Sequence, residues 1–465
     1  MYNGLDIEDF GKPVVLLVNK GFANDAHSAA SSRGMPGLRI LAESVACESN
    51  VAADIEQGTA AAMNDIVAGL TRPLSSEEKS PKSAAPKAPR VPKIAFKGSY
   101  EEVNGYFYSR GWTDGLPIAP PTMEAVAEMM TGTDLPPDHV VGKILPRLGK
   151  ATVEKIAINA VMAGALPTHM PVLIAVVQAL AQEETPKTRF DVFQVSTGSW
   201  APFVMINGPI REDINLNTGS GAFSPGNIAN AAIGRAVGLI VKNIGAARKG
   251  IEDMGVLGNP AKYSLVIGES EEESPWEPLH VERGFNKEDS TVTMFFPNQY
   301  IQSVPRGTDA KAILDSIADS GPRIMNALVI IPSHAKILAS EGWTKAKVRE
   351  YVMKLGDARS AESRPRSPDA SATAAAAAPS QRRLLSGGIG DATAPSTAVA
   401  APPTTPRDAL MIVVAGGAGS WYGLFRSSGG GILGNDFVSK KIQLPKNWRK
   451  VVAKYKGVVP TYDSY

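Results

Sequence analysis

The chain has 465 residues, of which 43% are hydrophobic, which is enough for sizeable cores in two or three domains. Its 48 basic and 46 acidic residues are interspersed and leave a formal net charge of +2, so no basic stripe points to nucleic acid as a partner. Cys47 is the one cysteine, which excludes an intramolecular disulfide and a zinc site built from several thiolates.

Residues 1–73 have the pattern of a small α/β unit. The runs PVVLLVN and LRILAE predict two strands, NDAHSAASSRG predicts a helix between them, and an amphipathic pattern ending near IVAGLT predicts a second helix. Two strands are few for an independent sheet. We therefore expect this truncated strand-helix-strand-helix unit to complete its sheet with another part of the chain, with a protein partner or with a second copy.

Two segments are rich in Pro, Ser and Ala and poor in large side chains, residues 74–98 and 357–407. Neither can bury enough apolar surface to offset the entropy of an ordered chain, so both are predicted to be disordered linkers. They separate the N-terminal unit from a main domain at 99–356 and from a C-terminal segment at 408–465.

The main domain is predicted to be a larger α/β sandwich. Helical runs such as ATVEKIAINAVMAG and DAKAILDSIADSG alternate with short β-branched runs such as YSLVIG, STVTMFF and NALVIIP. In the C-terminal segment, ALMIVVAGGAGSWYG predicts a strand and a glycine loop that pack on the main domain and pair into one of the sheets. The glycines of that loop serve either close approach to a ligand or tight packing.

The most apolar region, AINAVMAGALPTHMPVLIAVVQALA, is interrupted by Pro167 and Pro171. This pattern is typical of two buried helices and not of one membrane span. The N-terminal residues MYNGLDIEDFGKP lack the basic and then apolar pattern of a secretory signal. We therefore expect a soluble, cytoplasmic protein.

A glycine-rich stretch, TGSGAFSPGNIANAAIGRA, spans residues 218–236. A dinucleotide fingerprint needs a third glycine where Ser224 stands, so the stretch contains no nucleotide fingerprint. Ser224 is a suitable N-cap residue, and Pro225 is suitable for the first position of the following helix. A helix that begins there would leave backbone N–H groups free at the positive end of its dipole.

This geometry predicts a cradle for a carboxylate or phosphate group of a small-molecule substrate, with the alternative that the glycines only form a turn. The candidate anion-binding residues are Gly219, Ser220, Gly221, Ser224, Gly226, Asn227, Asn230 and Arg235.

A second constellation is ESEEESPWEPLHVERG. If PLHVERG is extended, His280 and Glu282 point to the same face and form a candidate acid-base pair. A divalent metal is a candidate cofactor, with His280, Glu282 and Glu273 as ligands. The alternative is a solvated acidic loop, and beyond these candidates the cofactor is unknown.

Asp114 and His169 complete the candidate catalytic residues. Asp114 lies in GWTDGLPIAPPT, where an Asp-Gly turn followed by prolines can hold a carboxylate toward a cleft or form a turn and nothing more. His169 lies between two prolines at a predicted helix-helix corner, where its imidazole either enters a pocket or is hydrogen-bonded as part of the core.

Several stretches resemble the family named for its selenocysteine-Gly-Ser-Cys (UGSC) motif. GKPVVLLVNKGFANDAHSAASSRGMPGLRIL and DIVAGLTRPLSSEE are similar to the second half of the UGSC domain. GWTDGLPIAPPT, INGPI, ANAAIGRAVGLI, EEESPWEPLHVERGF and IVVAGGAGSW are similar to the larger domain fused to it in bacterial proteins. The resemblance implies redox or thiol-type chemistry on a small molecule.

The chain departs from this family at the motif itself. Twelve residues precede Pro13 and none is a cysteine, while Cys47 lies in SVACESN beyond the first predicted strand. The resemblance therefore implies either that activity resides in the main domain or that a separate chain carries the missing half.

We expect a small-molecule enzyme of redox or lyase type acting on an anionic substrate. The alternatives are a non-catalytic subunit or scaffold that has lost the UGSC centre, and a redox enzyme that uses Cys47 with an external thiol.

Overall fold

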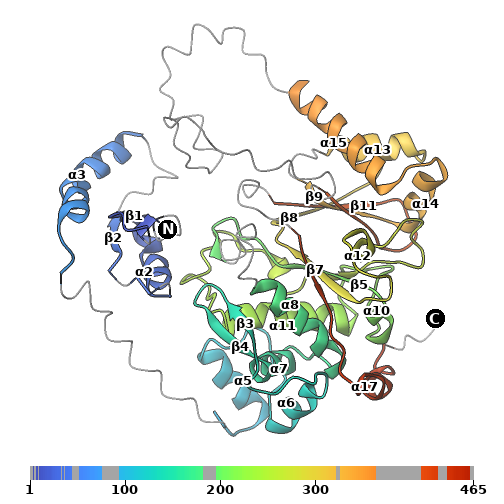
Figure 1. Ribbon diagram of the computed structural model, residues 1–465, viewed down its shortest axis with the longest axis horizontal. Helices are drawn as coiled ribbons and strands as arrows, with labels where there is room; N and C mark the ends of the chain where they lie inside the picture. Colours follow the sequence, from blue (N-terminus) through green and yellow to red (C-terminus); the bar gives the residue numbers. More distant parts are fainter. Residues whose placement is uncertain are drawn as a thin grey trace.

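The computed structural model describes residues 10–43 except 33 and 36, and 52–75, 94–181, 195–320, 325–362, 410–427 and 437–460, together with 4, 7 and 8. Helices and strands alternate along these ranges, which confirms the predicted α/β class (Figure 1). None of the described helices combines the length and the apolarity needed to cross a bilayer. Cys47 lies outside the described residues.

The N-terminal unit has the predicted order of elements, β1 (Val15–Asn19), the 3-10 helix η1 (Lys20–Phe22), α2 (Ala23–Ser32), β2 (Arg39–Glu43) and α3 (Ala52–Thr71). Strands β1 and β2 pair in parallel and form a two-stranded sheet. Its small core gathers Ala29 and Ala30 of α2 with Leu38, whereas α3 buries no residue. The unit contacts the main domain where Arg147 Nε donates to Ser28 Oγ over 2.9 Å.

The main domain begins with helices and a hairpin. These elements are α5 (Tyr100–Ser109), α6 (Met123–Met130), β3 (Val140–Ile144), β4 (Gly149–Thr152), α7 (Val153–Met162), η2 (Pro167–His169) and α8 (Met170–Leu180). Strands β3 and β4 are antiparallel. The apolar region that the sequence divides at its prolines is folded as two helices, α7 and α8, which meet at η2.

Elements of two larger sheets follow. They are β5 (Phe203–Asn207), α10 (Ile210–Asp213), α11 (Ile228–Asn243), η3 (Pro260–Lys262), β6 (Val266–Gly268), α12 (Leu279–Glu282), β7 (Thr291–Phe295), β8 (Gln299–Ser303), α13 (Ala310–Asp319), β9 (Met325–Ile330), α14 (Pro332–Ser340) and α15 (Lys345–Glu362). The C-terminal segment adds β10 (Met411–Val414), β11 (Tyr422–Arg426), β12 (Val438–Lys441) and α17 (Trp448–Tyr455).

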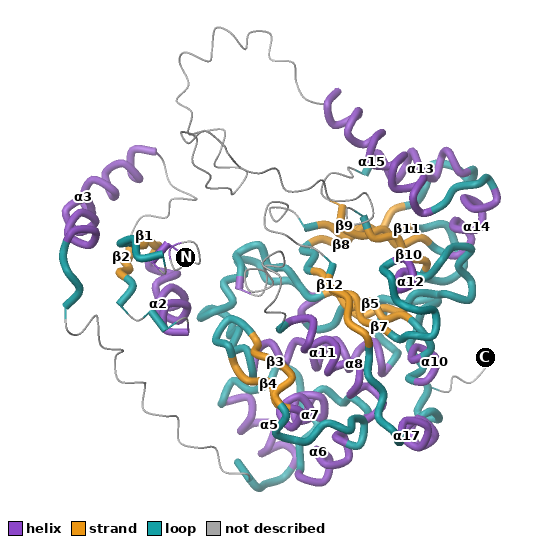
Figure 2. The backbone as a smooth tube through the Cα atoms, viewed as in Figure 1, coloured by secondary structure: helices purple, strands orange, loops and turns teal. Residues whose placement is uncertain are grey.

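The strands form two four-stranded mixed sheets, with the orders β12-β7-β5-β6 and β10-β9-β11-β8. Within them β5 is parallel to β6 and β9 is parallel to β10, while the other neighbours are antiparallel. The C-terminal segment therefore contributes strands to both sheets. Figure 2 shows the two sheets one above the other with helices on either side.

Alternating side chains on each strand separate three cores. On β5, Phe203 and Met205 face the second sheet, whereas Val204 and Ile206 face helices α7, α8 and α11. On β9, Val329 faces the first sheet and the neighbouring residues 328 and 330 face α13, α14 and α15. Since successive side chains of a strand point to opposite faces, the order of layers is helix, sheet, sheet, helix.

Aromatic rings fill the space between the sheets. Phe203 lies with its ring centroid 4.9 Å from Phe295 and 4.8 Å from Phe425, so three strands from both sheets meet at one cluster. All three residues are fully buried.

We predict that Phe203→Ala lowers the free energy of unfolding by about 3 to 5 kcal/mol, because it leaves a cavity between the sheets. The matched control is Leu257→Ala at a side chain that is 97% exposed, where a change within about 0.5 kcal/mol is expected. Urea unfolding followed by tryptophan fluorescence measures both. Equal losses for the two variants would contradict the proposed core.

Candidate functional site

A cluster of buried charges lies where β5 and β6 end. Asn207 is the last residue of β5 and Glu269 directly follows β6. Gly268 allows this turn, because a Cβ there would lie 2.7 Å from side-chain atoms of Leu216 and Thr218. The carboxyl ends of neighbouring parallel strands are a usual position for a binding site in an α/β sheet.

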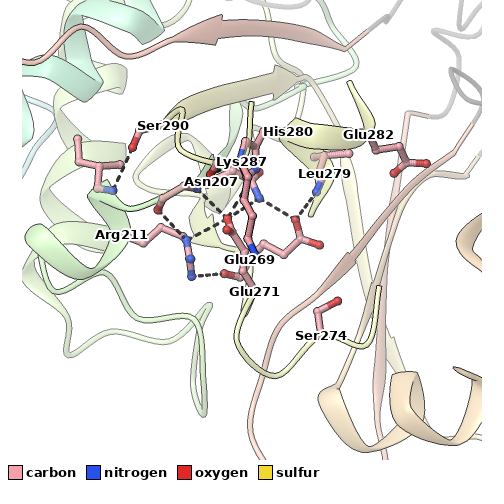
Figure 3. Close-up of polar contacts among 12 residues, drawn as sticks. Asn207, Arg211, Glu269, Glu271, Ser274, Leu279, His280, Glu282, Lys287 and Ser290 are labelled. Carbon is pink, nitrogen blue, oxygen red and sulfur yellow. Dashed lines mark hydrogen bonds and ion pairs between the residues drawn. The ribbon is translucent and has the colours of Figure 1, made fainter. Parts of the chain in front are cut away.

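Glu269 is the centre of the cluster (Figure 3). Its side chain is fully buried, and Oε2 accepts from Asn207 Nδ2 and from the backbone N of Leu279, each over 2.7 Å. Its Oε1 lies 3.2 Å from Nζ of Lys345, which is 6% exposed. The carboxylate thus joins the first sheet, α12 and the start of α15.

Arg211 forms the second part of the cluster. It donates to the carbonyls of Gly208 and Glu269 over 3.0 and 2.7 Å, and its guanidinium binds the Glu272 carboxylate through two hydrogen bonds. Burial by itself would lower the pKa of Arg211, but the hydrogen bond with Glu272 and the charges of Glu271, Glu272 and Glu269 raise it above the usual value.

Glu271 and His280 form a pair beside this arginine. Oε1 of Glu271 accepts from Asn207 Nδ2 and Gly208 N over 3.0 and 2.7 Å, and it lies 3.1 Å from Arg211 Nε. The same oxygen is 3.8 Å from Nδ1 of His280, a buried atom without a hydrogen-bond partner in the described chain. Because the carbonyl of Lys287, 3.2 Å from Nε2 of His280, can only accept a hydrogen bond, Nε2 is the donor there and Nδ1 is the ring nitrogen that faces Glu271.

A cavity of about 560 Å³ opens next to this pair. Its lining, which we call the Glu271 pocket, consists of Glu271, Glu272, Ser274, Trp276, Glu277, Pro278, Val281 and Lys287. The lining contains three glutamates and one lysine, so its charged residues carry an excess of negative charge. The rest of the wall consists of Ser274 and the apolar residues Trp276, Pro278 and Val281, and Trp276 Nε1 donates to the carbonyl of Trp343.

The predicted shared face of His280 and Glu282 is wrong, because residues 279–282 form the helix α12 and not an extended segment. Glu282 instead pairs with Arg349 over 2.5 Å and lies 3.7 Å from Lys345. His280 remains at the site through Glu271. The structure thus places His280 beside Glu271 and Glu282 beside Arg349.

The metal ligands proposed from sequence are not brought together. The described residues contain no group of three His, Cys, Asp or Glu side chains placed to hold a metal ion. Glu273 accepts a hydrogen bond from Ser270 Oγ over 3.3 Å. His280 faces Glu271 and Glu282 faces the basic residues of α15, so His280, Glu282 and Glu273 have separate partners.

Asp114 and Arg235, predicted for different roles, bind one another. Arg235 donates from Nε and one terminal nitrogen to the two carboxylate oxygens over 2.8 and 2.9 Å. Burial would raise the pKa of Asp114, but the hydrogen bond and charge of Arg235 hold it below its ordinary value. The pair ties the Asp-Gly turn to α11 and leaves no net charge there.

His169 lies in η2 and is fully buried. Its Nδ1 accepts from the backbone N of Leu166 over 3.2 Å, while Nε2 has no partner in the described chain. Burial lowers the pKa of His169 to about 3, so the ring is neutral near pH 7. His169 does not line the Glu271 pocket.

The cap predicted at Ser224 is wrong, because α11 begins at Ile228 and its cap is Asn227. Pro225 correspondingly precedes the helix and does not open it. The side chain of Asn227 accepts from Ala229 N and Asn230 N, so the helix cap already uses these two backbone donors at the start of α11. Anion binding at this loop stays a prediction.

The other predicted cradle residues are held by the protein itself. Asn230 is buried and donates to the carbonyls of Asn217 and Val266, while its oxygen accepts from Asn217 N. Gly219 N donates to the side chain of Asn217, and Ser224 N donates to Gly221 O. Gly221 and Gly226 have φ of +66° and +127°, which favour glycine at these two turns.

Sequence reasoning did not select Asn207, Arg211 or Lys345. Their partners lie far away in sequence, since Lys345 is separated from Glu269 by 76 positions. The sequence nevertheless contained one indication of such partners, the acidic residues at 269–273. Acidic side chains that are buried need basic partners, so this segment can fold inward only if basic residues lie beside it.

Comparison of the chain with protein-family models, with characterised proteins and with solved structures finds no significant match.

We predict that Glu269→Gln lowers the free energy of unfolding by about 3 to 5 kcal/mol, because it removes the buried carboxylate 3.2 Å from Lys345 and leaves this buried ammonium with the longer 3.7 Å contact to Glu282. Glu273→Gln is the matched control, since this exposed carboxylate of the same loop makes no ion pair within the described chain. Urea unfolding of both variants tests the difference. A loss below about 1 kcal/mol in Glu269→Gln would show that the pair is dispensable.

We further predict that His169 makes the protein sensitive to acid. The folded state keeps this ring neutral down to about pH 3, whereas the unfolded chain takes up a proton below the ordinary histidine pKa of 6.5. Acid therefore favours unfolding, and stability present above pH 6.5 falls by up to about 1.4 kcal/mol per pH unit as the pH decreases toward 3.

The measurement is the slope of unfolding free energy against pH between about 6 and 4, inside the window that the two pKa values of His169 define. His169→Gln is expected to have a shallower slope than the wild type, and the exposed-site variant His139→Gln to keep the wild-type slope. Equal slopes for the wild type and both variants would mean that protonation of His169 does not contribute to the loss of stability in acid.

Proposed function

We propose that the protein is an enzyme that transfers a proton to or from a small molecule bound in the Glu271 pocket. The observation that carries this proposal is the position of Glu271, which lines the cavity and lies 3.8 Å from the unpartnered Nδ1 of His280. A fixed carboxylate next to an unsatisfied imidazole is a typical arrangement for general acid-base catalysis.

Each group has a separate task in this proposal. Glu271 contacts the substrate, because it belongs to the pocket wall and its Oε2 makes no hydrogen bond within the described chain. Asn207 and the Gly208 N–H hold Oε1 and fix the direction of the carboxylate. His280 acts through Glu271, because its Nδ1 lies 3.8 Å from the carboxylate oxygen of this residue.

The pocket lining favours a substrate with a cationic or hydrogen-bond-donating group and an apolar body. Glu271, Glu272 and Glu277 suit the polar group, and Trp276, Pro278 and Val281 suit the apolar part. This differs from the anionic substrate expected at the glycine loop. Lys287, also in the lining, is the one cation that would accept a carboxylate on such a molecule.

Proton transfer of this kind is the central step of many lyase-type eliminations, so the lyase class is preferred here over the redox class. Redox chemistry rests on the resemblance to the UGSC-motif family. It remains a prediction that belongs to Cys47 or to a partner chain.

A non-catalytic subunit is the second candidate, and one observation favours it. The sheet of the N-terminal unit has two strands, and Met63, Val67 and Leu70 of α3 are 47, 51 and 41% exposed. An apolar helix face beside an incomplete sheet suits a protein partner or a second copy. A stoichiometric partner in native mass spectrometry of the full chain would support this function.

We predict that the wild-type protein, incubated with a metabolite extract in D₂O, causes deuterium uptake into, or consumption of, at least one small molecule. Glu271→Gln should slow this reaction by about 100-fold or more, because the group that exchanges the proton is lost. Mass spectrometry of the extract follows all of its small molecules at once, so the substrate need not be chosen in advance.

Two further variants complete the experiment. His280→Gln should also slow the exchange, and the control Glu124→Gln, at an exposed glutamate outside the pocket lining, should not. Equal rates for wild type and Glu271→Gln would refute the assignment, and the absence of any wild-type-dependent change would favour the non-catalytic subunit.

A further inference from the structure

A second cluster of reactive groups lies at the end of β10, where residues 415–420 connect it to β11. Ala415 N donates to Ile330 O, which places the start of this loop beside the end of β9. The loop also contacts the first turn of α14, since Ser333 Oγ lies 3.4 Å from the carbonyl of Gly419. The glycine loop of the C-terminal segment thus covers the N-terminus of a nine-residue helix.

The two glycine-rich loops noted in the sequence meet at this point. Gly416 N donates to Thr218 O over 2.9 Å, and Gly416 has a φ of +103°, which favours glycine. A Cβ at Gly417 would lie 2.9 Å from the Cα of Ser220, so glycine is needed for this close approach. These contacts fix the backbone that leads to Ser420.

Ser420 and His334 form a pair between a nucleophile and a base. Ser420 is exposed, and its Oγ lies 3.4 Å from Nε2 of His334, which is 4% exposed. Productive nucleophile-base pairs lie at about 2.6 to 3.2 Å and are often looser without substrate. Burial lowers the pKa of His334, so near pH 7 its ring is neutral and able to accept a proton.

The first turn of α14 supplies groups that stabilise negative charge. The N-cap residue Ile331, which precedes α14, makes no side-chain cap hydrogen bond, and the N–H groups of Ser333 and His334 have no acceptor within the described chain. These donors lie at the positive end of the helix dipole, under the loop that carries Ser420. An oxyanion formed on an acyl group at Ser420 would be stabilised there.

We propose that Ser420 is a nucleophile, activated by His334, that accepts an acyl group from an activated ester or thioester. Oγ attacks the carbonyl carbon and forms the new C–O bond, while the hydroxyl proton passes to Nε2 of His334. The bond between the carbonyl carbon and the alcohol or thiol then breaks, and the leaving group takes that proton. Water releases the acyl group as a carboxylic acid in the reverse sequence of proton transfers.

The pair has no third member within the described chain, because Nδ1 of His334 is buried without a hydrogen-bond partner. In serine hydrolases a carboxylate at this nitrogen stabilises the imidazolium. We therefore expect slow acylation and a covalent intermediate that persists long enough to be trapped. This site is separate from the Glu271 pocket and does not depend on the function proposed for it.

The test is covalent labelling of the full-length protein with a biotinylated alkyl fluorophosphonate. Ser420 Oγ would form a bond to phosphorus and fluoride would leave, and peptide mass spectrometry locates the adduct. We expect one adduct on wild-type protein, at Ser420, and none on Ser420→Ala, a variant at an exposed position that leaves the core intact. His334→Gln should label about 100-fold more slowly.

Two matched controls are expected to label at the wild-type rate. Ser340→Ala removes an exposed serine at the opposite end of α14 without touching the pair, and Glu271→Gln separates this site from the other pocket. An unlabelled wild-type protein, or an adduct that persists in Ser420→Ala, would refute the nucleophile. Unchanged labelling of a folded His334→Gln would refute the role of the histidine.

Discussion

The fully buried carboxylate of Glu269 is the interaction on which the candidate site depends. An unpaired carboxylate in such a position would be strongly unfavourable, so its three partners must be present together. Those partners come from β5, from the start of α12 and from α15 on the far side of the second sheet. The position of Glu271 two residues later is therefore a consequence of how both sheets are stacked.

The same cluster explains why acidic residues in succession can fold inward. Arg211 neutralises Glu272 and stands beside Glu271, whereas Lys345 neutralises Glu269. Basic partners from distant elements thus compensate the negative run and leave Glu271 with one oxygen that makes no hydrogen bond within the described chain. The candidate site therefore carries a local excess of negative charge, and the buried residues Arg211 and Lys345 neutralise the neighbouring carboxylates.

Much of the fold was predictable because apolar residues alternate with the period of their element. The strands β6, β7 and β9 and the helices α7 and α13 occupy the runs that the sequence marked. The helix α12 was not predictable, since four residues after Pro278 are too few to show a helical period. The extended assignment placed His280 beside Glu282, whereas the structure places it beside Glu271. The cap of α11 shows a different limit. Ser224 and Asn227 both suit an N-cap, and the positive φ at Gly226 makes the helix begin only after the later of these two residues.

Distant partners could not be predicted at all. Lys345 on α15 pairs with Glu269, and no local sequence pattern relates the two residues.

The arrangement of the strands has a consequence for how this protein is made. Strand β9 lies between β10 and β11, so both of its hydrogen-bonding edges are filled by residues near the C-terminus. Strand β7 likewise pairs with β12, which is synthesised later. Until residues 411–441 leave the ribosome, β8 and β9 have no neighbouring strand of their sheet and β7 lacks one of its two, and unpaired strand edges of this kind favour aggregation and chaperone binding.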